Sequence, residues 1–137
     1  MIKYTDFKLH SPERTFAEFI NGWINKNPNI MYNKSQISWR FGLDKLQKNR
    51  KSKGLQMVIL QLLQYELNDV VIHDFQHISD VWCQGILSAN VTAYGETRKV
   101  FIFAQLMKEN KTGKCDQTGT WGVNPISCLN QRENNNE

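Results

Sequence analysis

Asp69 and His73 are the residues of this chain whose types and spacing best suit proton-transfer chemistry. From Tyr65 to His73 the side-chain pattern has a period of two, and its Val and Ile residues suit a sheet. Asp69 and His73 then share one face of a predicted strand, where a buried carboxylate–imidazole pair can move a proton. The alternative is a pair that faces solvent or a partner, and the spacing alone does not decide between them.

A run of positive charge lies between Lys45 and Lys53, where nine residues carry five positive charges. A loop of this kind suits contact with phosphate groups. The alternative is a solvated surface loop, which we favour because the run has no interleaved aromatic residues. The net charge of +4, from 17 basic and 13 acidic residues, is also mild. We therefore expect no nucleic-acid partner.

The three cysteines, Cys83, Cys115 and Cys128, are widely spaced and odd in number. Without a Cys-x-x-Cys pair they predict neither a disulfide framework nor a zinc site, and we expect no metal and no cofactor. The first residues lack the apolar segment of a signal peptide, and no apolar run approaches the ~20 residues that span a bilayer. We expect reduced thiols in a cytoplasmic protein without membrane segments.

Helices are predicted for the first half of the chain. Ser11-Pro12-Glu13 combines a capping side chain, a proline suited to the first helical position and an acidic residue in the first turn. Apolar residues follow at helical spacing from Phe16 to Ile24, and Pro28 is expected to stop this helix.

The segment that follows the first helix is ambiguous. Residues 29–54 predict either a second helix, capped by Asn33 or Ser35, or an extended stretch. Leu55–Leu63 is apolar nearly all round, which fits a buried strand or a buried helix. Because Leu, Met and Gln favour helices, we predict a short buried helix that leads straight into a strand.

A meander of strands is predicted for the second half. Val81–Tyr94 and Arg98–Lys108 form two long strands, joined by a two-residue turn at Gly95-Glu96. Lys114–Val123 predicts a further strand. With 137 residues in all, we predict a single α+β domain over residues 1–129 and a flexible polar tail over residues 130–137.

The predicted hairpin has two unlike faces. With Gly95-Glu96 at the turn, Val91 pairs with Val100, and their face is small and apolar, so it should pack on the helices. The other face mixes large apolar and neutral polar side chains with few charges, as protein–protein interfaces do. We predict a homodimer surface; the alternative is a thin core layer beneath the N-terminal arm or the C-terminal tail. The predicted surface consists of Trp82, Gln84, Ile86, Ser88, Asn90, Phe101, Phe103, Gln105 and Met107.

The order of these elements resembles a known superfamily. Helices followed by Tyr65–His73, Asp80–Val91, the Gly95-Glu96 turn and Val100–Asn110 are similar to the cone-shaped nuclear transport factor 2-like superfamily, which includes SnoaL-type cyclases and ketosteroid isomerases. The resemblance is one of pattern and covers residues 12–124. It implies N-terminal helices packed on a curved antiparallel sheet (a cystatin-like cone), a pocket in the cone and, commonly, a dimer formed sheet to sheet.

The resemblance also implies where a site would lie. Family enzymes place carboxylates or tyrosines inside the cone; we match no such set here, which leaves Asp69 and His73 as the catalytic candidates. Our first functional hypothesis is a non-catalytic homodimer that binds a protein partner or an apolar small molecule. The alternative is an isomerase, cyclase or dehydratase that uses Asp69 and His73. Aromatic residues that could line the pocket, or simply form the core, are Trp23, Tyr32, Trp39 and Trp121.

Overall fold

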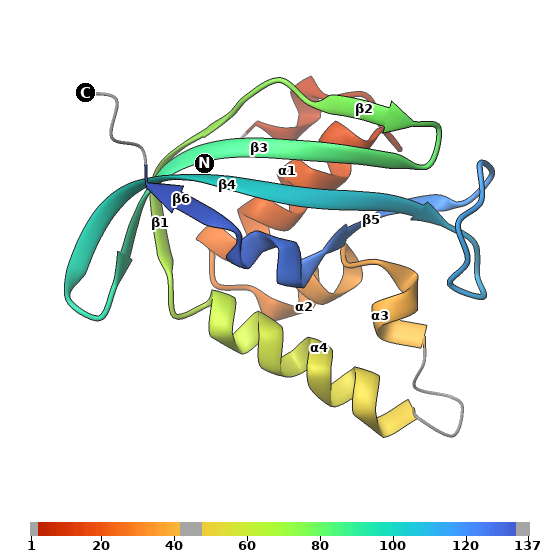
Figure 1. The fold of residues 1–137 in the computed structure, drawn as a ribbon, viewed down its shortest axis with the longest axis horizontal. Helices are drawn as coiled ribbons and strands as arrows, with labels where there is room; N and C mark the ends of the chain where they lie inside the picture. Colours follow the sequence, from red (N-terminus) through yellow and green to blue (C-terminus); the bar gives the residue numbers. More distant parts are fainter. Residues whose placement is uncertain (1–2, 42–47, 134–137) are drawn as a thin grey trace.

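The computed structural model describes residues 3–41 and 48–133, with side chains described for 3–40 and 54–133 (Figure 1). Within these described residues, four α-helices precede a curved, six-stranded antiparallel sheet, which confirms the predicted α+β fold with N-terminal helices. Helix α1 packs against the sheet, α2 packs beside α1, and α4 packs beside α2 (Figure 1). A short 3-10 helix, η1 (Tyr4–Asp6), precedes α1.

Helix α1 (Pro12–Ile24) forms as its sequence predicts. The side chain of Ser11 accepts a hydrogen bond from the backbone N–H of Arg14 at 3.1 Å, which satisfies a free donor at the start of the helix. The apolar stripe is buried, with Phe16, Phe19 and Ile20 at 0 % exposure. This stripe supplies the centre of the hydrophobic core against which the sheet packs.

Two short helices occupy the ambiguous segment. Helix α2 (Pro28–Asn33) is capped by Asn27, and α3 covers Ile37–Phe41. Between them, Ser35 forms a parallel bridge with Val123, at the edge of the sheet. Neither Asn33 nor Ser35 therefore caps a single long helix. The predicted basic run Lys45–Lys53 lies outside the described residues, apart from the backbone of α4 from Lys48 onward.

Helix α4 (Lys48–Leu62) decides the question left open for residues 55–63, because residues 55–62 are helical and none of them is in a strand. The predicted burial of this helix holds for one stripe only. Leu55, Ile59 and Leu62 are buried on one stripe, whereas Met57 and Leu60 are 69 % and 59 % exposed. The helix packs on α2, on α3 and on the 3-10 helix η3 (Pro125–Leu129), whereas Met57 and Leu60 point away from the core.

The sheet is built around one long hairpin, β3 (Trp82–Ala93) and β4 (Glu96–Glu109). Strands β1 (Glu66–Ile72) and β2 (Gln76–Ser79) both pair with β3, one after the other along its free edge. Strands β5 (Thr120–Asn124) and β6 (Gln131–Glu133) do the same along β4. The paired structure thus extends into the segment predicted as a flexible tail from residue 130.

The turn of the hairpin lies at Tyr94-Gly95, not at Gly95-Glu96 as predicted. Both central residues have positive φ, 53° for Tyr94 and 79° for Gly95, as type I′ hairpin turns require. The register moves by two residues, so Val91 pairs with Arg98 instead of Val100. A shift of two leaves every side chain on its predicted face, because the side-chain period of a strand is also two.

The predicted fourth strand begins later than expected, at Thr120 instead of Lys114. Side chains hold the residues before it in turns. Asn110 Oδ1 accepts hydrogen bonds from the backbone N–H groups of Thr112 and Lys114, and Asp116 Oδ1 accepts one from Thr118. Such local bonds compete with strand pairing.

A bulge interrupts β1 at Asp69. This residue has a φ of 53°, and the register with β3 shifts between Asn68 and Val71. An inserted residue reverses the alternation of side chains beyond it. Leu67, before the bulge, is therefore buried, whereas Val71, after it, is 53 % exposed. Leu67 and Val71 were predicted to share a face, so that part of the pattern is wrong.

Candidate functional site

The face of the sheet turned away from the core, here called the outer face, is the first candidate site. Along β3 and β4 every second residue is buried, from Cys83 to Val91 and from Val100 to Leu106. The residues between them point to the other side and are half-buried or exposed, with Trp82 at 37 % exposure. The outer face consists of Trp82, Gln84, Ile86, Ser88, Asn90, Phe101, Phe103, Gln105 and Met107.

Aromatic rings gather in the middle of the outer face. The ring centroids of Phe101 and Phe103 lie 6.4 Å apart, and the His73 ring lies 5.7 Å from that of Phe101. The guanidinium of Arg132, on β6, lies over the Phe103 ring at 4.6 Å from its centroid. Sequence reasoning missed His73 and Arg132 as neighbours of this face. Only the bulge in β1 and the pairing of β6 place them there.

Asp69 and His73 are each bonded to a different residue of the neighbouring strand. Asp69 Oδ2 accepts a hydrogen bond from the side-chain amide of Asn90 at 2.8 Å. His73 Nε2 lies 2.9 Å from the hydroxyl of Ser88, with the donor set by the imidazole tautomer. Both side chains are exposed, and each is bonded to a different residue of β3. The structure therefore places them at the surface beside the outer face.

The inner face of the sheet is occupied by core side chains. The Phe16 and Phe75 rings meet edge to face with centroids 5.5 Å apart, over the backbone of Gly85. A Cβ atom on Gly85 would lie 3.0 Å from the Phe16 ring, so glycine allows α1 to approach β3 closely. This part of the curved sheet is therefore packed.

The four aromatic residues proposed to line a pocket lie in different places. Trp23 is a core residue at 2 % exposure, and its Nε1 donates to the backbone carbonyl of Tyr65 at 2.9 Å. Trp39 is half-buried against the core. Tyr32 borders a cavity of about 280 Å³ between α2 and α4, whereas Trp121 borders a separate cavity at the end of β4.

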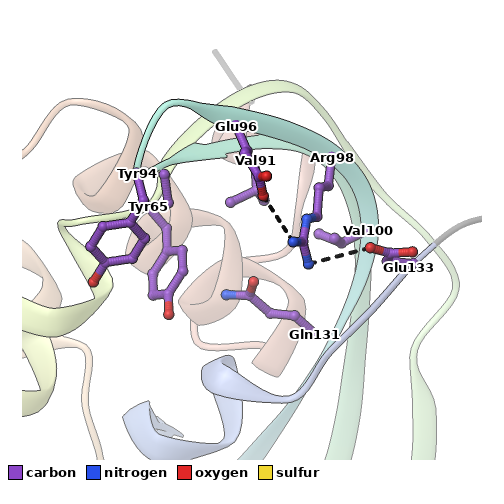
Figure 2. Close-up of a pocket in the computed structure, with 9 residues that line it drawn as sticks. Tyr65, Val91, Tyr94, Glu96, Arg98, Val100, Gln131 and Glu133 are labelled. Atoms are coloured by element: carbon purple, nitrogen blue, oxygen red, sulfur yellow. Dashed lines mark hydrogen bonds and ion pairs between the residues drawn. The ribbon is translucent and has the colours of Figure 1, made fainter.

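A second cavity of about 280 Å³ lies beneath the tip of the hairpin (Figure 2). Arg98 lies at its centre, with its guanidinium 2.9 Å from Glu96 and 3.3 Å from Glu133. The hydrogen bond and charge of Glu96, together with the charge of Glu133, raise the pKa of Arg98. The positive charge of Arg98 is therefore already paired with two carboxylates. Tyr65 and Tyr94 form the aromatic side of this cavity (Figure 2).

Comparisons of this chain with models of known protein families, with curated proteins and with solved structures found no match. Among the residues that the structure describes, no helix is long and apolar enough to cross a membrane. The same residues include no group of three or more His, Cys, Asp or Glu side chains placed to hold a metal ion.

Proposed function

We propose that this protein is a non-catalytic binding domain that forms a homodimer through the outer face of its sheet. The observation that carries the proposal is the contrast between the two faces of the hairpin. The inner face is buried against α1, whereas the outer face holds Phe101 and Phe103 half-buried and Trp82 at 37 % exposure. An exposed cluster of aromatic and Met side chains is characteristic of interfaces.

The described ends of the chain reach this face through the side chain of Arg132, which lies over the Phe103 ring. The N-terminal arm packs on α1, where Arg14 lies 4.8 Å from the centroid of the Tyr4 ring. The described part of the tail forms β6 at the edge of β4. These placements favour a dimer surface over the alternative, a thin core layer beneath the arm or the tail.

The composition of the outer face suits a second copy of the same chain. None of its nine residues is Asp, Glu, Lys or Arg. In a two-fold dimer the same patch meets itself, so these nine residues bring no like-charge repulsion of their own. Charged residues lie beside them, with Arg132 over the Phe103 ring and Asp69 bonded to Asn90. Neutral Gln, Ser and Asn side chains can form hydrogen bonds across such a contact.

We further propose that the chain belongs to the cone-shaped nuclear transport factor 2-like superfamily. The support is the order of N-terminal helices followed by a curved antiparallel sheet. The frequent sheet-to-sheet dimers of that superfamily agree with the dimer surface proposed above. A cytoplasmic location is also proposed, with support from the free thiols of Cys83, Cys115 and Cys128.

The alternative function, an isomerase, cyclase or dehydratase acting through Asp69 and His73, has less support. Both side chains are exposed and are bonded to different residues, Asn90 and Ser88. A general base needs a substrate held within hydrogen-bond reach, which an open sheet surface does not provide by itself.

Light scattering coupled to size exclusion tests the dimer. We expect the wild type to elute with twice the chain mass of 16.0 kDa. Phe101→Glu and Phe103→Glu should elute as folded monomers, because each would bury an unpaired charge in the contact. Leu60→Glu is the matched control, since Leu60 is 59 % exposed on α4, away from the outer face. A monomeric wild type, or a dimer that survives both Phe substitutions, would contradict the proposal.

A further inference from the structure

A cavity of about 340 Å³ lies near the end of the hairpin opposite the Tyr94-Gly95 turn. Lys108 pairs there with Trp121 of β5, and the segment before α1, the end of α2 and helix α3 complete the walls. Its volume falls in the range of small-molecule sites, at the lower end of roughly 300–1,000 Å³. The lining residues are His10, Thr15, Asn33, Lys34, Arg40, Lys108, Gly119, Thr120 and Trp121.

Positive charge converges on this cavity. Lys34, Arg40 and Lys108 come from three different elements, and no Asp or Glu is among the described residues that line it. His10 can add a further positive charge when protonated. Thr15 and Thr120 contribute hydroxyl groups to the walls. A concave site with this lining attracts an anion and offers it several hydrogen-bond donors.

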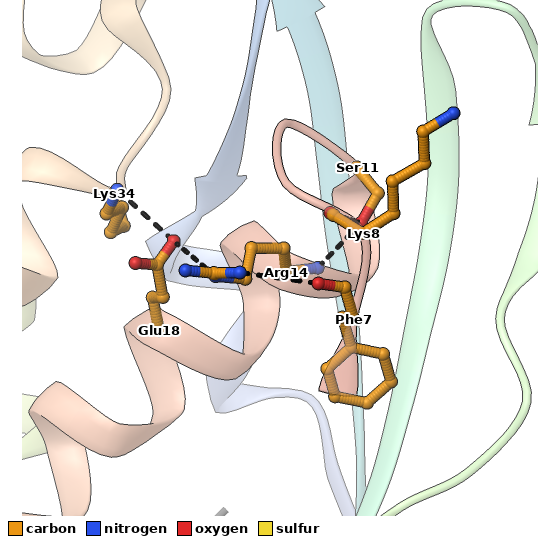
Figure 3. A network of polar contacts seen from close by, with 6 residues as sticks. All are labelled: Phe7, Lys8, Ser11, Arg14, Glu18 and Lys34. Atoms are coloured by element: carbon orange, nitrogen blue, oxygen red, sulfur yellow. Dashed lines mark hydrogen bonds and ion pairs between the residues drawn. The ribbon is translucent and has the colours of Figure 1, made fainter. Parts of the chain in front are cut away.

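The network shown in Figure 3 holds one of these cations in place. Lys34 Nζ lies 3.4 Å from Glu18 Oε1, and Arg14 Nε lies 3.8 Å from the same oxygen. Arg14 is anchored in turn by its hydrogen bond to the backbone carbonyl of Phe7 at 3.3 Å. Glu18 is not among the residues that line the cavity, and its carboxylate is shared between two cations, so it offsets the charge of Lys34 only in part.

The other two cations are also held by neighbouring groups. Arg40 Nε donates to the backbone carbonyl of Ser35 at 3.1 Å, and the side chain is half-buried. Burial lowers the pKa of Arg40, whereas the charges of Tyr32 and Glu109 raise it, so burial disfavours the charged guanidinium and a nearby anion favours it. Lys108 Nζ lies 5.9 Å from the centroid of the Trp121 ring, so a cation and an aromatic surface stand side by side.

We propose that this cavity binds a phosphate monoester of a small molecule. Arg40 and Lys108 bind the phosphate oxygens, Lys34 adds to the positive field, and Trp121 packs against the group esterified to the phosphate. A dianion suits a site with three cations, and the planar fork of a guanidinium matches phosphate oxygens. The proposal is independent of the dimer, because none of these residues belongs to the outer face.

Calorimetric titration of the full chain with inorganic phosphate and with phenyl phosphate tests the site. We expect both to bind, more weakly as salt is added, and phenyl phosphate to bind more tightly because of Trp121. Arg40→Gln and Lys108→Gln should each weaken binding by about tenfold, the usual effect of losing one charged hydrogen bond. Lys114→Gln is the matched control: Lys114 is exposed outside the cavity, and its loss changes the net charge equally.

Each outcome decides the question. The proposal is overturned if inorganic phosphate or phenyl phosphate fails to bind the wild type. It is also overturned if Lys114→Gln loses as much affinity as Arg40→Gln and Lys108→Gln, which would indicate only general charge attraction. If Arg40→Gln fails to fold, Lys108→Gln decides alone, with circular dichroism to confirm its fold. Replacement of Trp121 by Leu should remove the preference for phenyl phosphate; a preference that persists would contradict the role given to the ring.

Discussion

Glu109, the last residue of β4, accepts a hydrogen bond from the backbone N–H of Ser38 at 2.9 Å, across 71 residues of sequence. Ser38 lies in the first turn of α3, where backbone N–H groups lack partners within the helix. The other carboxylate oxygen accepts from the Ser38 hydroxyl at 3.0 Å and from the Gln36 side chain at 2.9 Å. A strand residue thus caps a short helix, and α3 depends on the sheet for its position.

Replacement of Glu109 by Ala should destabilise the protein by about 3 kcal/mol, because the buried Gln36 amide and the half-buried donors of Ser38 would lose a charged acceptor. Glu109→Gln retains one acceptor oxygen and should cost less. The free energy of unfolding in urea measures both effects. Glu66→Ala removes an exposed carboxylate from β1 and should leave that free energy unchanged. Equal stability of Glu109→Ala and Glu66→Ala would show that the contact contributes nothing.

Replacement of Tyr94 by Asn should stabilise the hairpin by about 0.5–1 kcal/mol, since Asn tolerates positive φ better than Tyr does. Tyr94 is 83 % exposed, so little packing is lost with its ring. Thermal unfolding followed by circular dichroism should show a higher midpoint. Replacement of Gly95 by Ala is the opposite test, because a φ of 79° strains any residue with a Cβ atom. A lower midpoint for Tyr94→Asn would be evidence against this turn.

Thiol labelling should distinguish the three cysteines. Cys115 is exposed, whereas burial raises the pKa of Cys83 and of Cys128 to about 12. At pH 8 only Cys115 should react with iodoacetamide in the native protein, because the thiolate is the reactive form and buried thiols stay protonated. All three should react in urea. Mass spectrometry counts the added groups, and Cys115→Ser should abolish native labelling; rapid native labelling of Cys83 would contradict its burial.

From the raised pKa of Cys83 and Cys128 we expect the folded protein to lose stability in alkaline solution. In the unfolded chain they ionise near pH 9.0, whereas in the folded protein the pKa is raised to about 12. The folded state therefore binds more protons between these values, and the free energy of unfolding must fall as pH rises through this window. The double variant Cys83→Ala with Cys128→Ala should show a shallower decline in urea melts from pH 8 to 10.5. An identical slope would contradict the raised pKa values.

Local patterns predicted the elements whose signals lie within a few residues. Helix α1 forms where Ser11 and Pro12 begin an apolar stripe, because capping and helical periodicity act over one or two turns. The division of the hairpin into two faces also holds in the structure, although its turn lies one residue earlier than predicted. Tyr94 contributed to that error, since a bulky residue with positive φ is uncommon and no local rule favours it.

The sequence by itself determined the α+β class, the first helix and the two unlike faces of the hairpin, because these follow from spacing along a short stretch of chain. Tertiary structure alone decided the bulge at Asp69, which carries His73 to the outer face beside Phe101. It also brought Arg40 and Lys108 to one cavity. Such contacts join residues far apart in the chain, and they depend on how the strands pair and how the helices pack on the sheet, which no local pattern encodes.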